Sequence, residues 1–403
     1  MSTIALVYPW MTFHTMDGKQ VIAGTAQEIV DRLKELNASP GHVRDTCGFV
    51  NTITPYNPEI YKVLVLDMLR EAGVKLLLHS FVDDVQVKGD RIESVRLTSK
   101  SGKIDVRAKM FIDTSGDADA AYLAGAPILQ GRDQDQLTQP MTMKFRMRGV
   151  DLAKVKQYML DHPDEFYKKT PISELQELPL TAVQGFYKHW KDACLPINRD
   201  QVLFFPGPGE DEVLVNTTRV QGLDGTRVED LTEAEELGRK QVLMVADFMV
   251  KRLPGFEKAS ISQVGAQIGI RETRRLDAST ACKSPTSPRD AASRTASRGA
   301  VPDRYPRPEE QRRDRRLDLG DGAYDIPYRC LLAKGISNLL AGGRCISTTH
   351  EALATTRLTP SCMATGQAAG TAAGMAVQTG ITPHEVNVSD LQRQLRLDGA
   401  LLD

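Results

Sequence analysis

Two stretches of this 403-residue chain combine residue types that suit ligand chemistry. The first is Asp113-Thr114-Ser115-Gly116-Asp117-Ala118-Asp119, which follows the apolar run 110–112 and precedes a segment of small residues. A buried strand, a glycine turn and a helix form the usual ligand crevice of α/β proteins, at the carboxyl end of the strand. The acidic cluster also suits a cation loop, but it lacks the glutamate that closes an EF-hand, so we predict no metal site.

The second stretch pairs the apolar run 336–346, which contains Gly343 and Arg344, with a helical segment that begins near Pro360. The free N–H groups and the positive dipole end of a helix N-terminus suit an anion. Gly366, Gly370 and Gly374 fall on one helix face, where a backbone or a flat ring can come close. Tight packing of the helix on a sheet explains the same spacing equally well, and the polar residues among the glycines argue against a membrane helix.

Periodicity predicts the elements that position these stretches. Apolar residues recur with helical spacing over 24–36, where Thr25 is the expected N-cap, and again over 58–72. An alternating pattern then predicts an antiparallel meander with strands over 74–87, 91–97 and 104–108, followed by the buried strand 110–112. Near the end of the chain we expect a buried strand over 336–346 and a helix over 360–379 that Gly380 ends.

The middle of the chain mixes both element types and then changes character. Strands are expected over 142–148, 202–205 and 212–217, with helices over 151–160 and 230–252, which is typical of an inserted α+β domain. Residues 278–316 contain ten Lys or Arg, and Val301 is their only Ile, Leu, Val or Met. Such a composition cannot bury a core, so we predict a disordered basic loop.

Together with the two stretches, three further motifs resemble the FAD-dependent oxidoreductase family related to the flavin part of heterodisulfide reductase. The motifs are Gly269-Ile-Arg271-Glu-Thr-Arg274-Arg275, Tyr324-Asp-Ile-Pro-Tyr-Arg329 and Cys345-Ile-Ser-Thr-Thr-His350-Glu-Ala-Leu. The resemblance implies a Rossmann-like, glutathione-reductase-like FAD/NAD(P)-binding fold with an antiparallel β-meander and an inserted α+β domain. It also implies transfer of a hydride or electrons between an organic substrate and FAD.

The resemblance assigns cofactor contacts and a domain plan. The contacts would come from Asp113, Thr114, Ser115, Gly116, Asp117, Ala118, Gly343, Arg344, Pro360, Met363, Gly366 and Gln367. The helix from Pro360 would point at the flavin, and its dipole would stabilise the anionic reduced form. The plan comprises part of the FAD domain (1–125), the inserted substrate domain (126–265), a return segment (266–277), an irregular stretch (278–317) and the last FAD-domain strand and helix (318–403).

The chain departs from the family pattern in two places. The family opens with a strand, a GxGxxG turn and a helix that hold the FAD pyrophosphate, and the sequence contains no such turn. We therefore expect an incomplete N-terminus and weakened FAD affinity. Residues 278–317 lack similarity to the family, and moving the reading frame within 292–306 restores family-like peptides, which favours the hypothesis of a shifted translation. A degenerate or non-enzymatic fragment is the alternative, as is an arginine-rich loop that binds an acidic partner.

The candidates for a catalytic role are His350, Glu351 and Arg271. Further candidates are Glu272, Arg274, Arg357 and His14. His350 suits a general base or the orientation of a hydride donor, and it equally suits a structural histidine satisfied by the backbone or by Glu351. Arg271 and Arg274 suit an anionic substrate, or an ion pair with Glu272 and nearby carboxylates.

Composition excludes several other classes. A net charge of -1, 41% hydrophobic and 26% charged residues indicate an ordinary globular protein without overall attraction to nucleic acid. The six cysteines include no CxxC pair, so the sequence predicts neither a disulfide framework nor an iron–sulfur cluster. No apolar run is long enough for a membrane span. We expect a cytoplasmic enzyme that acts on a small molecule, and the sequence does not indicate its oligomeric state.

Overall fold

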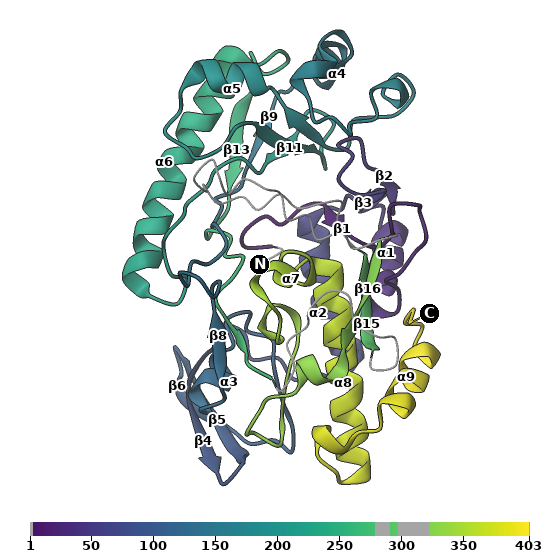
Figure 1. Cartoon of the computed structure of the whole chain (residues 1–403), viewed down its shortest axis with the longest axis vertical. Coiled ribbons are helices and arrows are strands. Elements are labelled where there is room, and N and C mark those ends of the chain that lie inside the picture. The colour runs from purple at the N-terminus through teal and green to yellow at the C-terminus, as the bar shows by residue number, and fades with distance from the viewer. Residues whose placement is uncertain (1–2, 279–290, 297–321, 403) are drawn as a thin grey trace.

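A parallel strand pair joins the two chemistry-bearing stretches in the computed structural model, which describes residues 3–278, 291–296 and 322–402 (Figure 1). Strand β7 (Phe111–Asp113) pairs with β17 (Leu339–Ala341), so that Asp113 lies beside Ala341. Helix α8 (Thr359–Thr379) packs against both strands and ends at Gly380, whose φ of 73° is left-handed, as predicted. The predicted α/β class is confirmed.

The second strand is shorter than its apolar run suggested. After Ala341 the chain leaves the sheet, and residues Gly343–Cys345 form a 3₁₀ turn in which Gly343 has a φ of 67°. A residue in this left-handed conformation cannot continue a strand. The prediction of a strand over 336–346 is therefore wrong at its carboxyl end, and the turn brings Arg344 back over the sheet edge.

The β-meander forms as predicted except at its start. Its strands β4 (Phe81–Lys88), β5 (Arg91–Ser99) and β6 (Gly102–Val106) pair antiparallel in chain order, after helix α2 (Pro58–Glu71) and before the short helix α3 (Asp119–Leu123). Residues 74–80 are not a strand, because Gly73 turns the chain at the end of α2 and His79 has a φ of 56°. Val74 and Leu78 are exposed instead.

The N-terminal elements cover the opposite side of α8. Helix α1 (Thr25–Glu35) is the predicted amphipathic helix, with Val30 and Leu33 fully buried. Its N-cap is Gly24 rather than Thr25, because Thr25 is already helical and its N–H donates to the side chain of Gln367 on α8. Strands β1 (Trp10–Met11), β3 (Thr52–Thr54) and β2 (Val43–Arg44) form a small antiparallel sheet in that order.

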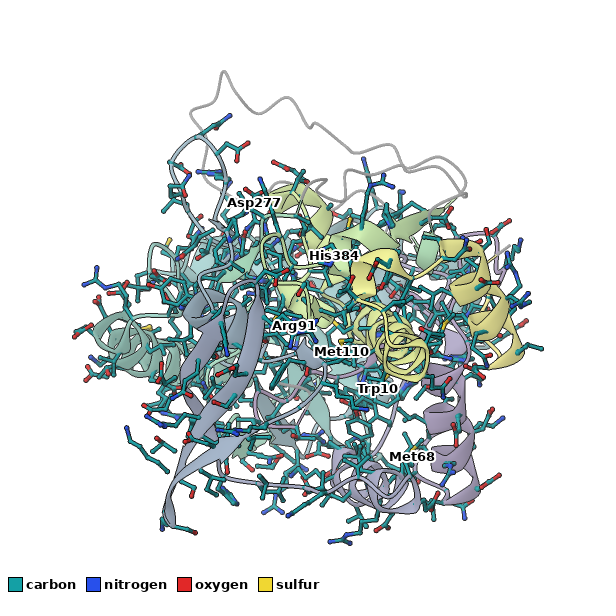
Figure 2. All side chains as sticks on the ribbon, turned by 90° about the horizontal axis from the view of Figure 1, so that it is seen from below. Trp10, Met68, Arg91, Met110, Asp277 and His384 are labelled. Carbon is teal, nitrogen blue, oxygen red and sulfur yellow. The ribbon has the colours of Figure 1, made fainter. Side chains whose placement is uncertain are left out.

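A five-stranded antiparallel sheet occupies the middle of the chain (Figure 1). In spatial order it comprises β10 (Val183–Gly185), β11 (Val202–Pro206), β12 (Val213–Val215), β9 (Phe145–Arg148) and β13 (Ser260–Val264). One face packs under α4 (Leu152–Asp161), α5 (Tyr187–Ala193) and α6 (Val228–Arg252). The other face, with Leu203, Phe205 and Leu214, packs against Tyr8 and Trp10 of the N-terminal segment. Figure 2 shows the molecule from below with its side chains, and Trp10 is among those labelled.

The remaining elements tie this sheet to the parallel strands. Strand β8 (Ile128–Gln130) pairs antiparallel with β14 (Arg274–Leu276), and helices α7 (His350–Thr356) and α9 (Val388–Leu397) flank α8. Strand β15 (Ala291–Ala296) pairs with β16 (Ala323–Pro327), so the predicted disorder is wrong for 291–296. The rest of that prediction, over 279–290 and 297–317, lies outside the described residues. Within the described part of the chain, no helix is both long and apolar enough to cross a bilayer.

Candidate functional site

The loops after β7 and β17 meet at one edge of the parallel pair. The N–H of Gly342 donates to the carbonyl oxygen of Asp113 (3.0 Å), which continues the strand pairing into the loops. Ligands of open α/β sheets bind outside the carboxyl ends of parallel strands. The structure therefore brings together the two stretches that were selected for their chemistry.

The carboxylate of Asp113 holds the loop that follows β7 through hydrogen bonds. Its carboxylate is 4% exposed and accepts hydrogen bonds from the N–H of Ser115 (3.0 Å), the hydroxyl of Ser115 (2.7 Å) and the N–H of Ala121 (3.0 Å). These partners account for its oxygens, so Asp113 acts by positioning the loop. The N–H of Gly116 donates to Sγ of Cys345 (3.1 Å), and burial together with the charge of Asp113 raises the pKa of that thiol to about 12. Cys345 is therefore a neutral link between the two loops.

Gly116 and Arg344 fit closely against each other. Gly116 has a φ of 89°, and a Cβ there would lie 2.2 Å from Nη2 of Arg344. The guanidinium crosses this glycine to reach Oδ1 of Asp117 (3.6 Å) and the carbonyl oxygen of Ile270 (3.1 Å). A glycine is required here both for the backbone conformation and for the space.

A second arginine balances the acidic loop. Nε of Arg274 donates to the carbonyl oxygen of Asp117 (2.9 Å), and its Nη2 pairs with Asp119. Burial, with the nearby charge of Asp117, raises the pKa of Asp119. Of the two possibilities for Arg274, an anionic substrate or an ion pair with nearby carboxylates, the structure shows the ion pair. Two arginines, Arg274 and Arg344, thus lie beside the carboxylates of this loop.

The first half of α8 packs onto the β17 loop. The N–H of Gly343 donates to Oγ1 of Thr365 (3.0 Å), and a Cβ on Gly342 would lie 3.5 Å from Cα of Gly366. Pro360 is buried, and Met363 packs against the N-terminal apolar cluster. Gln367 accepts from the N–H of Thr25 (3.1 Å) and donates to the carbonyl oxygen of Asp398 (3.3 Å), so its amide links α8 to α1 and to the end of α9.

A buried polar network lies beside these loops and contains His350. Nδ1 of His350 lies 2.7 Å from Oε2 of Glu272, as an ion-pair contact rather than an aligned hydrogen bond. Glu272 has a side-chain exposure of 0%, and it also accepts from Nη1 of Arg275 (2.6 Å) and from the N–H of Gln139 (2.9 Å). Burial lowers the pKa of Arg275. The carboxylate partner of His350 is Glu272, whereas Glu351 is exposed at the start of α7.

Gln139 extends this network to the segment before α8. Its Nε2 donates to the carbonyl oxygen of His350 (3.1 Å), and its Oε1 accepts from Nε of Arg357 (2.8 Å). Arg271 lies nearby, donating to the carbonyl oxygen of Pro140 and to Oδ1 of Asn216 (3.5 Å). Sequence reasoning missed Gln139, which belongs to no motif, and it quoted Arg275 within the motif Gly269–Arg275 without assigning it a role.

His14 lies outside this network. Its Nδ1 is 2.8 Å from Oγ1 of Thr52, and its ring stands 4.8 Å from that of His42. Burial lowers the pKa of both rings, that of His42 to about 4. The structure thus separates His14 from the other candidates.

Two buried hydroxyls near α8 lack a hydrogen-bond partner in the described part of the chain. Oγ1 of Thr348 and Oγ1 of Thr356 are buried, and within 3–278, 291–296 and 322–402 neither has a hydrogen-bond partner. Thr348 precedes α7, and Thr356 ends it. Buried polar atoms are normally paired, so these hydroxyls are suited to a bound partner. Together with the glycine turns, they fit a polar cofactor such as FAD, whereas Arg274 and Arg344 already pair with Asp119 and Asp117.

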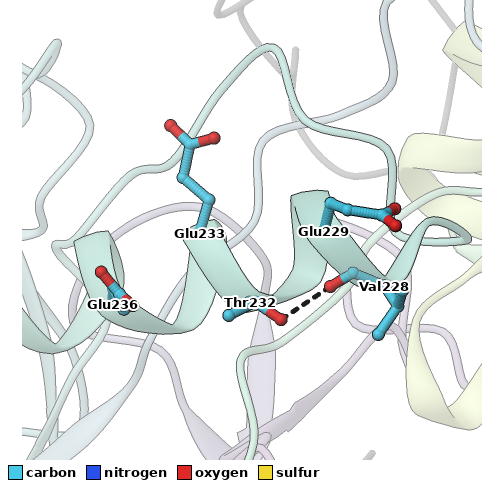
Figure 3. Close-up of a pocket in the computed structure, with 5 residues that line it drawn as sticks. All are labelled: Val228, Glu229, Thr232, Glu233 and Glu236. Atoms are coloured by element: carbon cyan, nitrogen blue, oxygen red, sulfur yellow. Dashed lines mark hydrogen bonds between the residues drawn. The ribbon is translucent and has the colours of Figure 1, made fainter.

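A separate pocket of 430 Å³ lies at the start of α6 (Figure 3). Its lining consists of Val228, Glu229, Thr232, Glu233 and Glu236. The hydroxyl of Thr232 is used within the helix, where it donates to the carbonyl oxygen of Val228 (2.7 Å). The pocket shares no residue with the loops or with the polar network. Among the described residues no group of His, Cys, Asp and Glu suits a metal ion.

A family model for FAD dependent oxidoreductases matches residues 1–395, and the chain therefore belongs to this family. It is an FAD-dependent oxidoreductase, a family that acts on small molecules, and its function is FAD-dependent redox chemistry. The non-enzymatic alternatives are not favoured. The finer relation to glutathione reductase and to heterodisulfide reductase stays a prediction, as do the domain boundaries and the cytoplasmic location.

Solved structures similar to this chain are distant. They include a geranylgeranyl bacteriochlorophyll reductase-like protein from Thermoplasma acidophilum (10% identity, TM-score 0.44, covering 95% of this chain and 75% of that chain). The myxobacterial chondrochloren halogenase CndH has 10% identity and a TM-score of 0.44, over 91% of this chain and 66% of that chain. The flavin-dependent brominase Bmp2 has 11% identity and a TM-score of 0.42, over 94% and 73%. No curated protein shows significant sequence similarity to the chain.

Proposed function

We propose that FAD lies along the carboxyl ends of β7 and β17. The residues that would hold it are the loop Asp113–Ala118, the turn Gly343–Arg344 and the first turns of α8, with Pro360, Met363, Gly366 and Gln367. The observation that carries this proposal is the parallel register, which sets Asp113 beside Ala341 and so joins the two loops. The unpartnered hydroxyls of Thr348 and Thr356 supply further candidate contacts.

FAD would supply the site that takes up or gives back two electrons with a proton. His350 and Glu272 are the chain's own groups for the proton. Because Nδ1 of His350 faces the buried carboxylate of Glu272, its Nε2 is the atom that can exchange a proton with a substrate. Glu272 is thereby a positioning residue, and Glu351, a catalytic candidate from the sequence, is not part of this proposal. Arg271 would help to orient the substrate.

Photolabelling tests the proposed FAD position. The protein is loaded with an FAD analogue that carries an azide on the flavin ring, illuminated and digested, and labelled peptides are identified by mass spectrometry. We expect the label on peptides from residues 343–367 or 113–118, and excess FAD should abolish it. Labelling confined to other peptides would overturn the proposed position.

Flavin reduction tests the assignment of His350. A panel of small organic reductants is screened for those that bleach the bound flavin, and the bleaching rate is compared between wild type and two variants. His350→Gln should retain FAD and bleach it about 100-fold more slowly, the contribution typical of a general base. Glu351→Gln is the matched control and should keep the wild-type rate. An unchanged rate in His350→Gln would show that His350 does not handle the proton.

A further inference from the structure

The segment 74–81, which links α2 to the first residue of β4, presents apolar side chains to solvent (Figure 1). Val74, Leu77, Leu78 and Phe81 are all exposed, Phe81 to 78% and Leu78 to 61%. Exposed hydrophobic residues of a soluble protein are usually scattered singly. Four of them within eight residues therefore indicate an interaction surface.

The backbone of this segment is unpaired as well. Residues 74–78 form no helix, turn or bend. The N–H of Val74 donates to the carbonyl oxygen of Leu69 at the end of α2 (2.9 Å), whereas the N–H groups of residues 75–78 have no hydrogen-bond partner in the described part of the chain. A straight segment with unpaired backbone groups is a template on which another chain can pair.

Both faces of the segment are uncovered. Leu77 and Leu78 are consecutive, and consecutive side chains of an extended chain point to opposite faces, yet both are exposed. An exposed apolar side chain of this size offers on the order of 100 Å², so two copies of the segment would bury roughly 800 Å² through their four apolar side chains each. A stable interface buries about 1,200–2,000 Å² in total, and backbone pairing with contacts of the flanking polar residues would supply the remainder.

Charges of opposite sign lie near the two ends of the segment. Lys75 is exposed and has no ion pair within the described residues. Asp84, three residues after Phe81, has a side chain that is 52% exposed and lies 3.9 Å from Nη1 of Arg96. An isologous interface sets one surface against its own copy about a twofold axis. Such an axis through the apolar centre brings the lysine end of one copy to the aspartate end of the other, so the surface is complementary to itself.

We infer that residues 74–81 form the contact surface of a homodimer, in which the segments of two copies lie antiparallel and bury Val74, Leu77, Leu78 and Phe81 between them. The occupant of this surface is a second copy of the chain, because the segment itself supplies the apolar area, the free backbone groups and both charges. The inference concerns association and does not depend on where FAD binds.

Analytical ultracentrifugation of the full chain over a hundredfold range of concentration tests the inference. Wild type should have the mass of two chains at the highest concentration, and Leu78→Asp should halve that mass. Leu243→Asp is the matched control, since Leu243 on α6 is 66% exposed, and it should leave the dimer intact. Because both leucines are exposed, neither substitution removes a core contact, and circular dichroism checks that both variants are folded.

Hydrogen–deuterium exchange of wild type needs no substitution. The N–H groups of residues 75–78 should exchange at least about 10-fold more slowly in the concentrated protein than in the dilute protein, because amides that become paired between strands are protected. Peptides from α6 should exchange at the same rate in both samples.

A wild type that remains a monomer over the whole concentration range would overturn the inference, and the surface would then belong to a partner of another kind. A Leu78→Asp protein that remains a dimer would also overturn it. Unchanged exchange at residues 75–78 in a dimeric wild type would have the same meaning, since the two copies would then meet elsewhere.

Discussion

At the scale of single residues, Gly116 is a position in the candidate site where a side chain would clash with its neighbours. Gly116→Ala would force a side chain into a left-handed conformation and against the guanidinium of Arg344, 2.2 Å away. We expect a loss of about 2 kcal/mol in the free energy of unfolding, measured by urea denaturation. Gly374→Ala is the control, since a Cβ there meets nothing within 4 Å on an exposed helix face, and it should stabilise. Equal stability of the two variants would contradict this interpretation.

Glu272 is the residue on which the polar network depends. Glu272→Gln would leave the buried Arg275 without its carboxylate and would remove the carboxylate beside His350, so we expect the free energy of unfolding to fall by about 3 kcal/mol. Glu233→Gln, on the exposed face of α6, should change it by less than about 0.5 kcal/mol. A Glu272→Gln protein as stable as wild type would mean that the carboxylate does not hold the network.

His42 should make stability depend on pH. Its ring is held neutral in the fold, because burial and the neighbouring His14 lower its pKa to about 4, while an unfolded histidine titrates near about 6.5. Its contribution to stability is therefore complete above pH 6.5 and is lost as the pH falls toward 4.

Unfolding free energies between pH 7.5 and pH 4.5 check this dependence. The decline should be shallower in His42→Gln than in wild type, while His384→Gln, at an exposed site, should follow wild type. A decline of the same steepness in His42→Gln would contradict the assignment.

At the scale of elements, α8 joins the site to the core. Thr365 is fully buried, and its hydroxyl accepts from the N–H of Gly343 while donating to carbonyl oxygens one turn earlier in the helix. Thr365→Val would leave that N–H without an acceptor, and we expect a loss of about 1–2 kcal/mol together with weaker FAD retention.

Differential scanning calorimetry with and without FAD measures both effects of this substitution. Thr379→Val is the matched control, because the hydroxyl of Thr379 bonds only within the exposed end of α8. If Thr365→Val retained FAD as well as wild type does, the β17 turn would not depend on α8 for its geometry.

Elements with a local signal were predicted well. The helix from Pro360 to Thr379 carries its own start and stop in proline and glycine, and the β-meander carries strand periodicity and turn residues. The errors fall where local and long-range forces compete. Residues 74–80 have strand-like composition, yet they pair with no strand in the described structure, and the apolar run after Ala341 turns at Gly343, whose φ of 67° is left-handed.

At the scale of the whole molecule, the candidate site is assembled from segments far apart in the chain. The two loops and the helix N-terminus were recognisable from their motifs, because glycines and a strand-to-helix turn mark them. The pairing of His350 with Glu272 was not, and neither was the bridging role of Gln139, because contacts between residues 139, 272 and 350 exist only after folding.

FAD titration of the flavin-free protein, wild type against Thr356→Val, tests the central claim most directly. The Thr356 hydroxyl is buried and has no partner in the described residues, so its isosteric replacement should leave the flavin-free protein as stable as before, or more so. If this hydroxyl bonds FAD, the dissociation constant should rise about 5-fold or more. Unchanged FAD affinity in Thr356→Val, or no FAD binding by wild type, would contradict the account.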